Sequence, residues 1–441
     1  MESMGNGKPK DSDGYLLQIA DNVGEKTQEV IKAIELNLLP AASDGTIRIV
    51  ELGTGGGEST QAIKDALVGK EGVEIIAVDL SIGILGKVQK RSGVSSVAAD
   101  ATTLPFKNGS LSGVNASAVF HEVSSYGPFK QEASAHYEEG VYGREAIIRV
   151  LTDVQRSLVP GGMLAYRDIH APNDPQQKKH VRYDRHVWDR FARWFYSNFL
   201  EADRRVFPGE APLTLEQQDG HLHITASVHQ HRELQRHYLM LRDYVRTQLA
   251  GSIGLEVMRE EWTDQTLGIK SHEITARGLF YQCLTHDDGE GYTRRILSSD
   301  NYDDVCDDVI NLLLDDHSIF RSEMDNWKKR EGKEVYTYAS IGEMLELSVD
   351  AARRVDDGHV LFPQSTTDLK VIPRDYYNHY LRRVIDDPEF DGKQTIRFFK
   401  IPNSEATKVL RAFENNGSLL APRDIRHING LLAERLTISN K

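Results

Sequence analysis

The stretch from Ile47 to Thr60 (IRIVELGTGGGEST) is the feature that most constrains how this 441-residue chain can fold. Its apolar start predicts a short strand, its glycines predict a tight turn, and the residues from Ser59 onward predict a helix. Glycine permits positive φ angles in such a turn and lets a ligand approach the backbone. A strand, a glycine turn and a helix open the nucleotide-binding α/β sheets, so we expect a doubly wound, mostly parallel sheet.

The glycine spacing distinguishes two kinds of nucleotide site. A dinucleotide-binding turn has the pattern G-x-G-x-x-G. Here Gly53, Gly55 and Gly57 give G-x-G-x-G, and Glu58 stands where the last glycine would be. That glutamate would also repel a pyrophosphate at the start of the helix. A nicotinamide-dependent oxidoreductase is therefore the least favoured function.

Acidic residues follow the next two predicted strands. The strand Val73–Asp79 ends in Asp79, 22 residues beyond Gly57, where a carboxylate can accept hydrogen bonds from both hydroxyls of a ribose. The strand Ser96–Ala101 leads into Leu-Pro-Phe, and two further strands are predicted at Leu111–Val119 and Met163–Asp168.

These motifs resemble those of the class I S-adenosylmethionine-dependent methyltransferases. E-x-G-x-G-x-G resembles motif I, Asp79 motif II, the run A-D-A-x-x-L-P-F motif III, and R-x-L-V-P-G-G-x-L the signature that follows. The resemblance implies an enzyme of the EC 2.1.1 class with a seven-stranded Rossmann-like sheet and S-adenosyl-L-methionine as its cofactor. The cofactor-binding residues that it implies are Glu51, Gly53, Thr54, Gly55, Gly57, Asp79, Leu80, Asp100, Ala101 and Ser117.

Three residues at the expected carboxyl edge of the sheet are candidates for catalysis: His121, Glu122 and Asp168. His121 has an ordinary pKa near working pH and could serve as a general base. The alternative is a histidine that packs on the adenine or caps the next helix. No N-P-P-Y tetrad is present, which weakens methylation of DNA adenine or of glutamine.

Residues 170–250 interrupt the strand–helix alternation and predict a helical lid over the substrate. Its segment Gln176–Ser197 mixes basic and aromatic residues, of which Arg182, Arg185 and Trp188, with Arg167 at the fifth strand, are candidates for substrate binding. The alternative is an amphipathic helix with a buried aromatic face and solvated charges. His229, Glu233 and His237 share one helix face, which we interpret as a solvated polar face, and no metal is expected.

The predicted organisation has three parts. Residues 1–45 form a tail and a helix, residues 46–286 form the methyltransferase domain, and residues 292–441 form a smaller α+β domain that resembles no recognised family. Segments 254–263 and 272–285 are expected to close the central sheet as an antiparallel hairpin. The last domain is interpreted as a module for partner binding or for a homodimer.

Composition limits the setting and the partners. The formal charge of −13 disfavours broad binding of nucleic acid, and two cysteines argue against disulfides and cysteine-rich zinc sites. No apolar run is long enough to span a bilayer and Met1–Gly14 is polar, so we expect a cytoplasmic protein without a membrane partner. The expected substrate is a small or medium-sized metabolite that is anionic or aromatic. RNA, a ribonucleotide or a peptide is the alternative substrate, and a non-catalytic cofactor-binding protein is the alternative function.

Overall fold

The computed structural model describes residues 23–126, 143–206, 213–245, 256–263, 270–277, 279–284, 292–297, 307, 309–311, 313–314, 321–332, 334–373, 384–386, 392–415 and 419–438. None of the helices within these ranges is long and apolar enough to cross a membrane.

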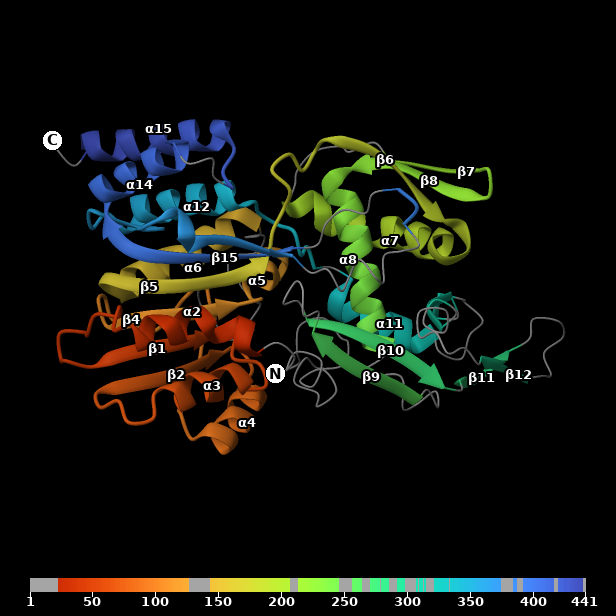
Figure 1. The fold of residues 1–441 in the computed structure, drawn as a ribbon, viewed down its shortest axis with the longest axis horizontal. Helices are drawn as coiled ribbons and strands as arrows, with labels where there is room; N and C mark the ends of the chain where they lie inside the picture. The colour runs from red at the N-terminus through yellow and green to blue at the C-terminus, as the bar shows by residue number, and fades with distance from the viewer. Residues whose placement is uncertain are drawn as a thin grey trace.

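A central sheet organises the structure (Figure 1). Seven strands form its main path in the order β3-β2-β1-β4-β5-β15-β13. Their bounds are β1 (Ile47–Leu52), β2 (Val73–Asp79), β3 (Ser95–Ala98), β4 (Leu111–Ser117), β5 (Leu158–Ile169), β13 (His359–Phe362) and β15 (Gly392–Pro402). The first five strands are parallel, while β15 runs antiparallel to both β5 and β13. The predicted fold class, a mostly parallel seven-stranded Rossmann-like sheet, is confirmed.

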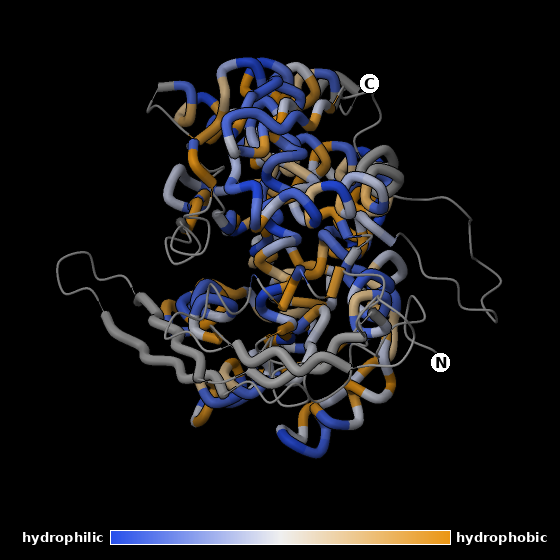
Figure 2. Tube along the Cα trace, turned by 90° about the vertical axis from the view of Figure 1, so that its right-hand side faces the viewer, coloured by the Kyte–Doolittle hydropathy of each residue, from blue (hydrophilic) through white to orange (hydrophobic). Residues whose placement is uncertain are grey.

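Helices cover the sheet, and several of them pack against one another. The helix α2 (Val23–Glu35) packs against α3 (Glu58–Ala66), and α6 (Gly143–Ser157) packs against α12 (Ile341–Val355). The remaining helices of this part are α4 (Ile82–Ser92), α5 (Phe120–Tyr126), α14 (Asn403–Asn415) and α15 (Pro422–Ile438). Figure 2 shows hydrophobic stretches through the middle of the molecule and more hydrophilic ones over the C-terminal helices.

The strands that close the sheet differ from the predicted ones. Segments 254–263 and 272–285 do not join the central sheet: β9 (Glu256–Thr263) pairs with β10 (Lys270–Arg277), and β11 (Leu279–Leu284) pairs with β12 (Tyr292–Leu297). That prediction is wrong, because β15 fills the place beside β5 instead. Its apolar side chains are buried, and its cations Arg397 and Lys400 meet the carboxylates of Asp368 and Asp357.

Residues 359–402 therefore belong to the central sheet rather than to a sheet of their own. A further strand, β14 (Leu369–Pro373), also pairs with β15. The helices α14 and α15 are the C-terminal elements that follow the sheet.

A long insertion separates β5 from α12. It contains an antiparallel sheet of β6 (Lys178–Asp184), β8 (His221–Ser227) and β7 (Thr214–Gln218), and the helices α7 (Arg185–Val206), α8 (Val228–Tyr244) and α11 (Arg321–Glu331). These elements lie beside the carboxyl end of β5 (Figure 1). Residues 170–250, predicted to be helical, thus contain strands as well as helices.

Candidate functional site

The turn between β1 and α3 has the conformation that its glycines predict. Gly53, Gly55 and Gly57 have φ angles of 67°, 53° and 86°, which side chains rarely adopt. A Cβ atom on Gly53 would also lie 2.3 Å from Cγ2 of Val119, in the connection between β4 and α5. Glycine is therefore required here both for the backbone conformation and for the close approach.

Asp79 at the end of β2 faces this turn. Its carboxylate accepts hydrogen bonds from the backbone N–H of Gly55 and, at 2.9 Å, of Ser81. Burial raises the pKa of Asp79 to about 6, and the nearby carboxylate of Glu122 acts in the same direction. The structure thus brings the acidic end of β2 and the glycine turn together.

Glu51 lies buried on β1 and points to the neighbouring strand. Its Oε2 accepts a hydrogen bond of 2.8 Å from Nδ2 of Asn115 on β4, and the same nitrogen donates to the carbonyl of Lys26 in α2 at 3.1 Å. Burial raises the pKa of Glu51 to about 8, so it carries a proton at neutral pH. This arrangement connects β1 to α2 through Asn115.

The other expected cofactor residues also lie at strand ends. Thr54 in the glycine turn contacts the hydroxyl of Thr60, and Leu80 directly follows Asp79. Asp100 follows β3 and accepts two hydrogen bonds of 2.7 Å from Thr102, which fix the turn containing Ala101. All ten expected residues thus meet at the carboxyl edge of β1 to β4, the place where ligands of such sheets bind.

Arg167, a candidate for substrate binding, is already held by the protein. It is 2% exposed, donates to Oγ of Ser117 at the end of β4 at 3.2 Å, and forms an ion pair with Glu25 in α2. The contacts of this side chain therefore link α2 to the carboxyl ends of β4 and β5.

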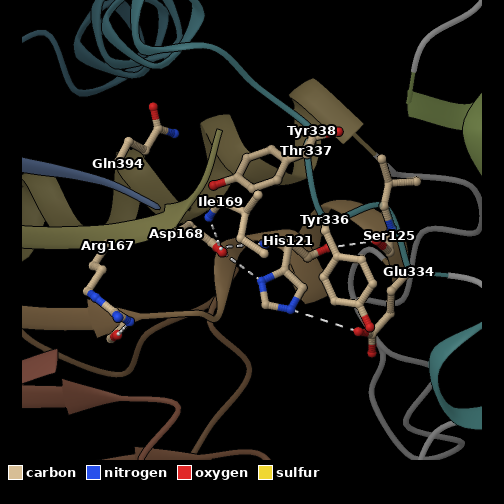
Figure 3. Close-up of polar contacts among 12 residues, drawn as sticks. His121, Ser125, Arg167, Asp168, Ile169, Glu334, Tyr336, Thr337, Tyr338 and Gln394 are labelled. Atoms are coloured by element: carbon tan, nitrogen blue, oxygen red, sulfur yellow. Dashed lines mark hydrogen bonds and ion pairs between the residues drawn. The ribbon is translucent and has the colours of Figure 1, made fainter. Parts of the chain in front are cut away.

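His121, at the start of α5, and Asp168, near the end of β5, form a buried pair (Figure 3). Nδ1 of His121 lies 2.8 Å from Oδ1 of Asp168, and the backbone N–H of His121 donates to the other carboxylate oxygen at 3.1 Å. Burial lowers the pKa of His121, but the charge and hydrogen bond of Asp168 outweigh it and leave the pKa raised. Because Asp168 accepts the hydrogen on Nδ1, the neutral ring presents Nε2 as an acceptor.

A segment of the insertion covers the opposite side of His121. Oε2 of Glu334 lies 3.8 Å from Nε2 of His121, and the ring of Tyr336 lies 5.2 Å from the imidazole, centre to centre. The backbone N–H of Val335 donates to Oγ of Ser125, which itself donates to the carbonyl of His121, both at 2.7 Å. We call residues 334–340 the strap.

The strap is held from its other side by Glu233 of α8. This carboxylate is fully buried and accepts hydrogen bonds from the backbone N–H and the hydroxyl of Thr337, each at 2.5 Å, and from the N–H of Tyr336 at 3.3 Å. His229 lies 3.0 Å from the hydroxyl of Thr337, and Nδ1 of His237 lies 2.9 Å from the carbonyl of Glu233. The prediction of a solvated polar face for these three residues is wrong, because α8 is a buried helix.

The sequence did not single out Glu334, Tyr336, Ser125 or the anchoring role of Glu233. One signal was available: the capping box of Ser340 and Glu343, which marks the start of α12. A helix between two parallel strands begins at the carboxyl edge of the sheet, so the residues just before Ser340 belong near the candidate site.

The predicted substrate residues of the lid lie elsewhere. Trp188 is fully buried in the aromatic core of the insertion, with its ring 4.4 Å from that of Tyr238, centre to centre. Arg182 binds Asp386 through Nε and Nη2, and Arg185 begins α7 with an exposed side chain. The alternative of an amphipathic helix with a buried aromatic face and outward charges holds from Arg185 onward, where α7 begins, but Lys178–Asp184 forms the strand β6 instead. No cluster of metal-ligating side chains occurs within the described residues.

Comparison with known proteins identifies one domain. A family model described as "Methyltransferase domain" matches residues 50–166, which run from β1 into β5. No curated protein matches the chain.

Solved structures that match this chain include DesVI from Streptomyces venezuelae, at 10% identity and a TM-score of 0.30, covering 88% of this chain and 96% of that one. The CcbJ methyltransferase from Streptomyces caelestis has 11% identity and a TM-score of 0.30, with coverages of 86% and 97%. An S-adenosylmethionine-dependent methyltransferase from Aquifex aeolicus has 13% identity and a TM-score of 0.26, with coverages of 49% and 98%.

Proposed function

We propose that this chain, which carries a class I S-adenosylmethionine-dependent methyltransferase domain, methylates a protic atom of a small or medium-sized metabolite. The observation that supports this proposal most is the buried pair of His121 and Asp168. It lies at the carboxyl edge of the same sheet as the glycine turn and Asp79.

The residues at this edge fit the cofactor. The glycine turn would let the cofactor approach its backbone, and Asp79 would offer a carboxylate to the ribose hydroxyls. Asp100 and Ala101 would receive the adenine, and Glu51 would lie toward the methionine end. Glu58 at the start of α3 forms an ion pair with Arg91, so this helix end already has its negative charge, as suits a cofactor without phosphate. When bound, S-adenosylmethionine supplies a methyl group whose bond to sulfur breaks as the acceptor's lone pair forms the new bond.

His121 would act as the general base. Asp168 holds the imidazole in the tautomer that leaves Nε2 to receive a proton, and its charge stabilises the imidazolium that forms. Tyr336 and Glu334 of the strap complete the surroundings of the ring.

The substrate that we propose is neutral or cationic. The anionic metabolite expected from the sequence loses its support, because Arg182 is bound to Asp386 and Arg167 to Glu25. RNA loses its support as well, because Trp188 and Phe191 are buried and unavailable for stacking on bases.

The test uses the full chain, tritiated S-adenosylmethionine and the small-molecule fraction of an extract of the cells that make the protein. We expect label to enter a small molecule with the wild type and to fall at least 100-fold with His121→Ala. The matched control is His427→Ala, which removes an exposed histidine from α15. Absence of label with the wild type, or equal labelling by His121→Ala, would contradict the proposed function.

A further inference from the structure

A single hydroxyl group in α5, that of Ser125, contacts both the proposed base and the insertion (Figure 3). Ser125 lies one helical turn after His121, and its Oγ donates to the carbonyl of His121 at 2.7 Å. The same oxygen accepts a hydrogen bond from the backbone N–H of Val335 in the strap, also at 2.7 Å. Because Ser125 and Val335 are both buried, water does not compete for these bonds. The hydroxyl therefore joins α5 to the strap.

The neighbouring Ser124 shows that a buried serine in this helix does not form such a link by itself. Its side chain is fully buried, yet its Oγ has no hydrogen-bond partner among the residues that the structure describes. Successive residues are turned by roughly 100° around a helix, so the two serines face different sides of α5. Of these two, Ser125 is the one placed to reach the strap.

The link fixes the part of the strap that surrounds the imidazole. Val335 stands between Glu334 and Tyr336, and both of these contact His121. Oε2 of Glu334 lies 3.8 Å from Nε2 of His121, which makes an ion pair rather than a hydrogen bond, so Glu334 acts on the ring through its charge. A displacement of Val335 would move its two neighbours along with it.

Three carboxylates face the imidazole, each from its own part of the structure. Asp168 on β5 contacts Nδ1, Glu122 follows His121 in α5, and Glu334 belongs to the strap. Burial lowers the pKa of His121, whereas all three carboxylates raise it. Asp168 and Glu122 lie outside the strap, so the contribution of Glu334 is the one that depends on where the strap lies.

We infer that Ser125 is a positioning residue of the proposed reaction, because its hydroxyl holds the strap against α5 and keeps Glu334 and Tyr336 beside His121. This inference rests on the proposed function and adds to the same site a residue that acts through the base. Without the hydroxyl, the buried N–H of Val335 loses its acceptor, which is costly, and the strap moves away from α5. The imidazolium that forms during proton transfer then loses the charge of Glu334 and keeps that of Asp168.

Hydrogen exchange tests the link without any acceptor molecule. In Ser125→Ala, we expect peptides that contain Val335 to exchange about tenfold faster than in the wild type. The matched control is Ser124→Ala, which truncates the same kind of side chain in the same helix and should exchange as the wild type does. Unchanged binding of S-adenosylhomocysteine, measured by calorimetry, shows that both variants fold. Wild-type exchange around Val335 in Ser125→Ala would overturn the inference.

The pH dependence of methyl transfer tests the role in the reaction. The assay follows the initial rate at which tritium passes from S-adenosylmethionine to the small-molecule fraction of the extract. We expect Ser125→Ala to lower this rate about tenfold. The lower limb of its pH–rate profile should move by roughly 0.5 pH units or more to lower pH, because a less stabilised imidazolium loses its proton at lower pH. A residue that only stabilised the fold would leave the limb in place.

A second variant, Ser125→Cys, keeps the test decisive if the alanine variant does not fold. Cysteine has nearly the same shape as serine, but its thiol is a weak donor and acceptor, so the limb should move in the same direction and less far. An unmoved limb in the Ser125 variants, or an equal shift in Ser124→Ala, would overturn the inference and leave the proposed function intact. Absence of label with the wild type would instead overturn the proposed function, and the inference with it.

Discussion

Substitution of Glu233 by glutamine should release the strap from α8. The carboxylate accepts hydrogen bonds from three donors, all in Tyr336 and Thr337, and its side chain is fully buried. A hydrogen bond to a charged group contributes about 1.5–3 kcal/mol, and such contributions do not add fully. Glutamine keeps one acceptor oxygen and turns an NH2 group toward the remaining donors. We therefore expect the strap to lose about 2–4 kcal/mol of local stability.

Hydrogen exchange followed by mass spectrometry measures this loss directly. At 1.4 kcal/mol for each factor of ten, peptides that cover the strap should exchange roughly 30- to 700-fold faster in Glu233→Gln. Peptides from β1 and β2 should exchange as in the wild type, because the groups that donate to the carboxylate of Glu233 lie in the strap and not in these strands. Glu414→Gln is the control for removal of a glutamate charge from an exposed site. Wild-type exchange of the strap in Glu233→Gln would refute the reasoning.

Three further predictions concern the sheet edge. In Glu51→Gln, stability relative to the wild type should rise by up to about 1.4 kcal/mol per pH unit between pH 4.5 and 8. In this range the carboxyl of Glu51 has lost its proton in the unfolded wild-type chain, whereas in the folded chain its pKa of about 8 keeps the proton bound. Urea denaturation of both proteins at several pH values gives the slope. Parallel plots of stability against pH for the two proteins would contradict this prediction. Gly53→Ala should destabilise the protein by about 1–3 kcal/mol, because the added Cβ meets Val119 at a φ of 67°; an unchanged melting temperature would be the contrary result. Asp168→Asn should lower kcat about 10²- to 10⁴-fold. It should also move the lower limb of the pH–rate profile to lower pH, since the carboxylate that raises the pKa of His121 is gone. An unchanged position of that limb would contradict the role of Asp168 in holding His121 as the base.

Those parts of the fold that depend on short stretches of sequence could be predicted. The glycine turn and Asp79 lie within 27 residues of each other, and the strand, turn and helix around them carry their own patterns. The placement of Asp79 against Gly55 follows from parallel strands whose carboxyl ends share one edge.

Long-range pairings could not be predicted in the same way. β15 pairs with β5 across more than 200 residues, and the hairpins of the insertion have the same alternating patterns that a closing strand would have. Ser125 and Val335 are 210 residues apart, so no local pattern places Glu334 beside His121. The burial of His229 and Glu233 depends on the strap packing over α8, which helix periodicity alone does not show.

Calorimetric binding of S-adenosylmethionine to the wild type and to Asp79→Ala tests the central claim most directly. The wild type should bind one cofactor per chain, with affinity that weakens as the pH falls below about 6, because Asp79 then takes up a proton. Loss of the carboxylate removes two charge-assisted hydrogen bonds and should weaken binding by about 2–4 kcal/mol, or roughly 30- to 700-fold. The affinity of Asp79→Asn, which keeps the shape of the side chain, should lie between those of the wild type and Asp79→Ala. Equal affinity of Asp79→Ala and the wild type, or no binding by the wild type, would contradict the account.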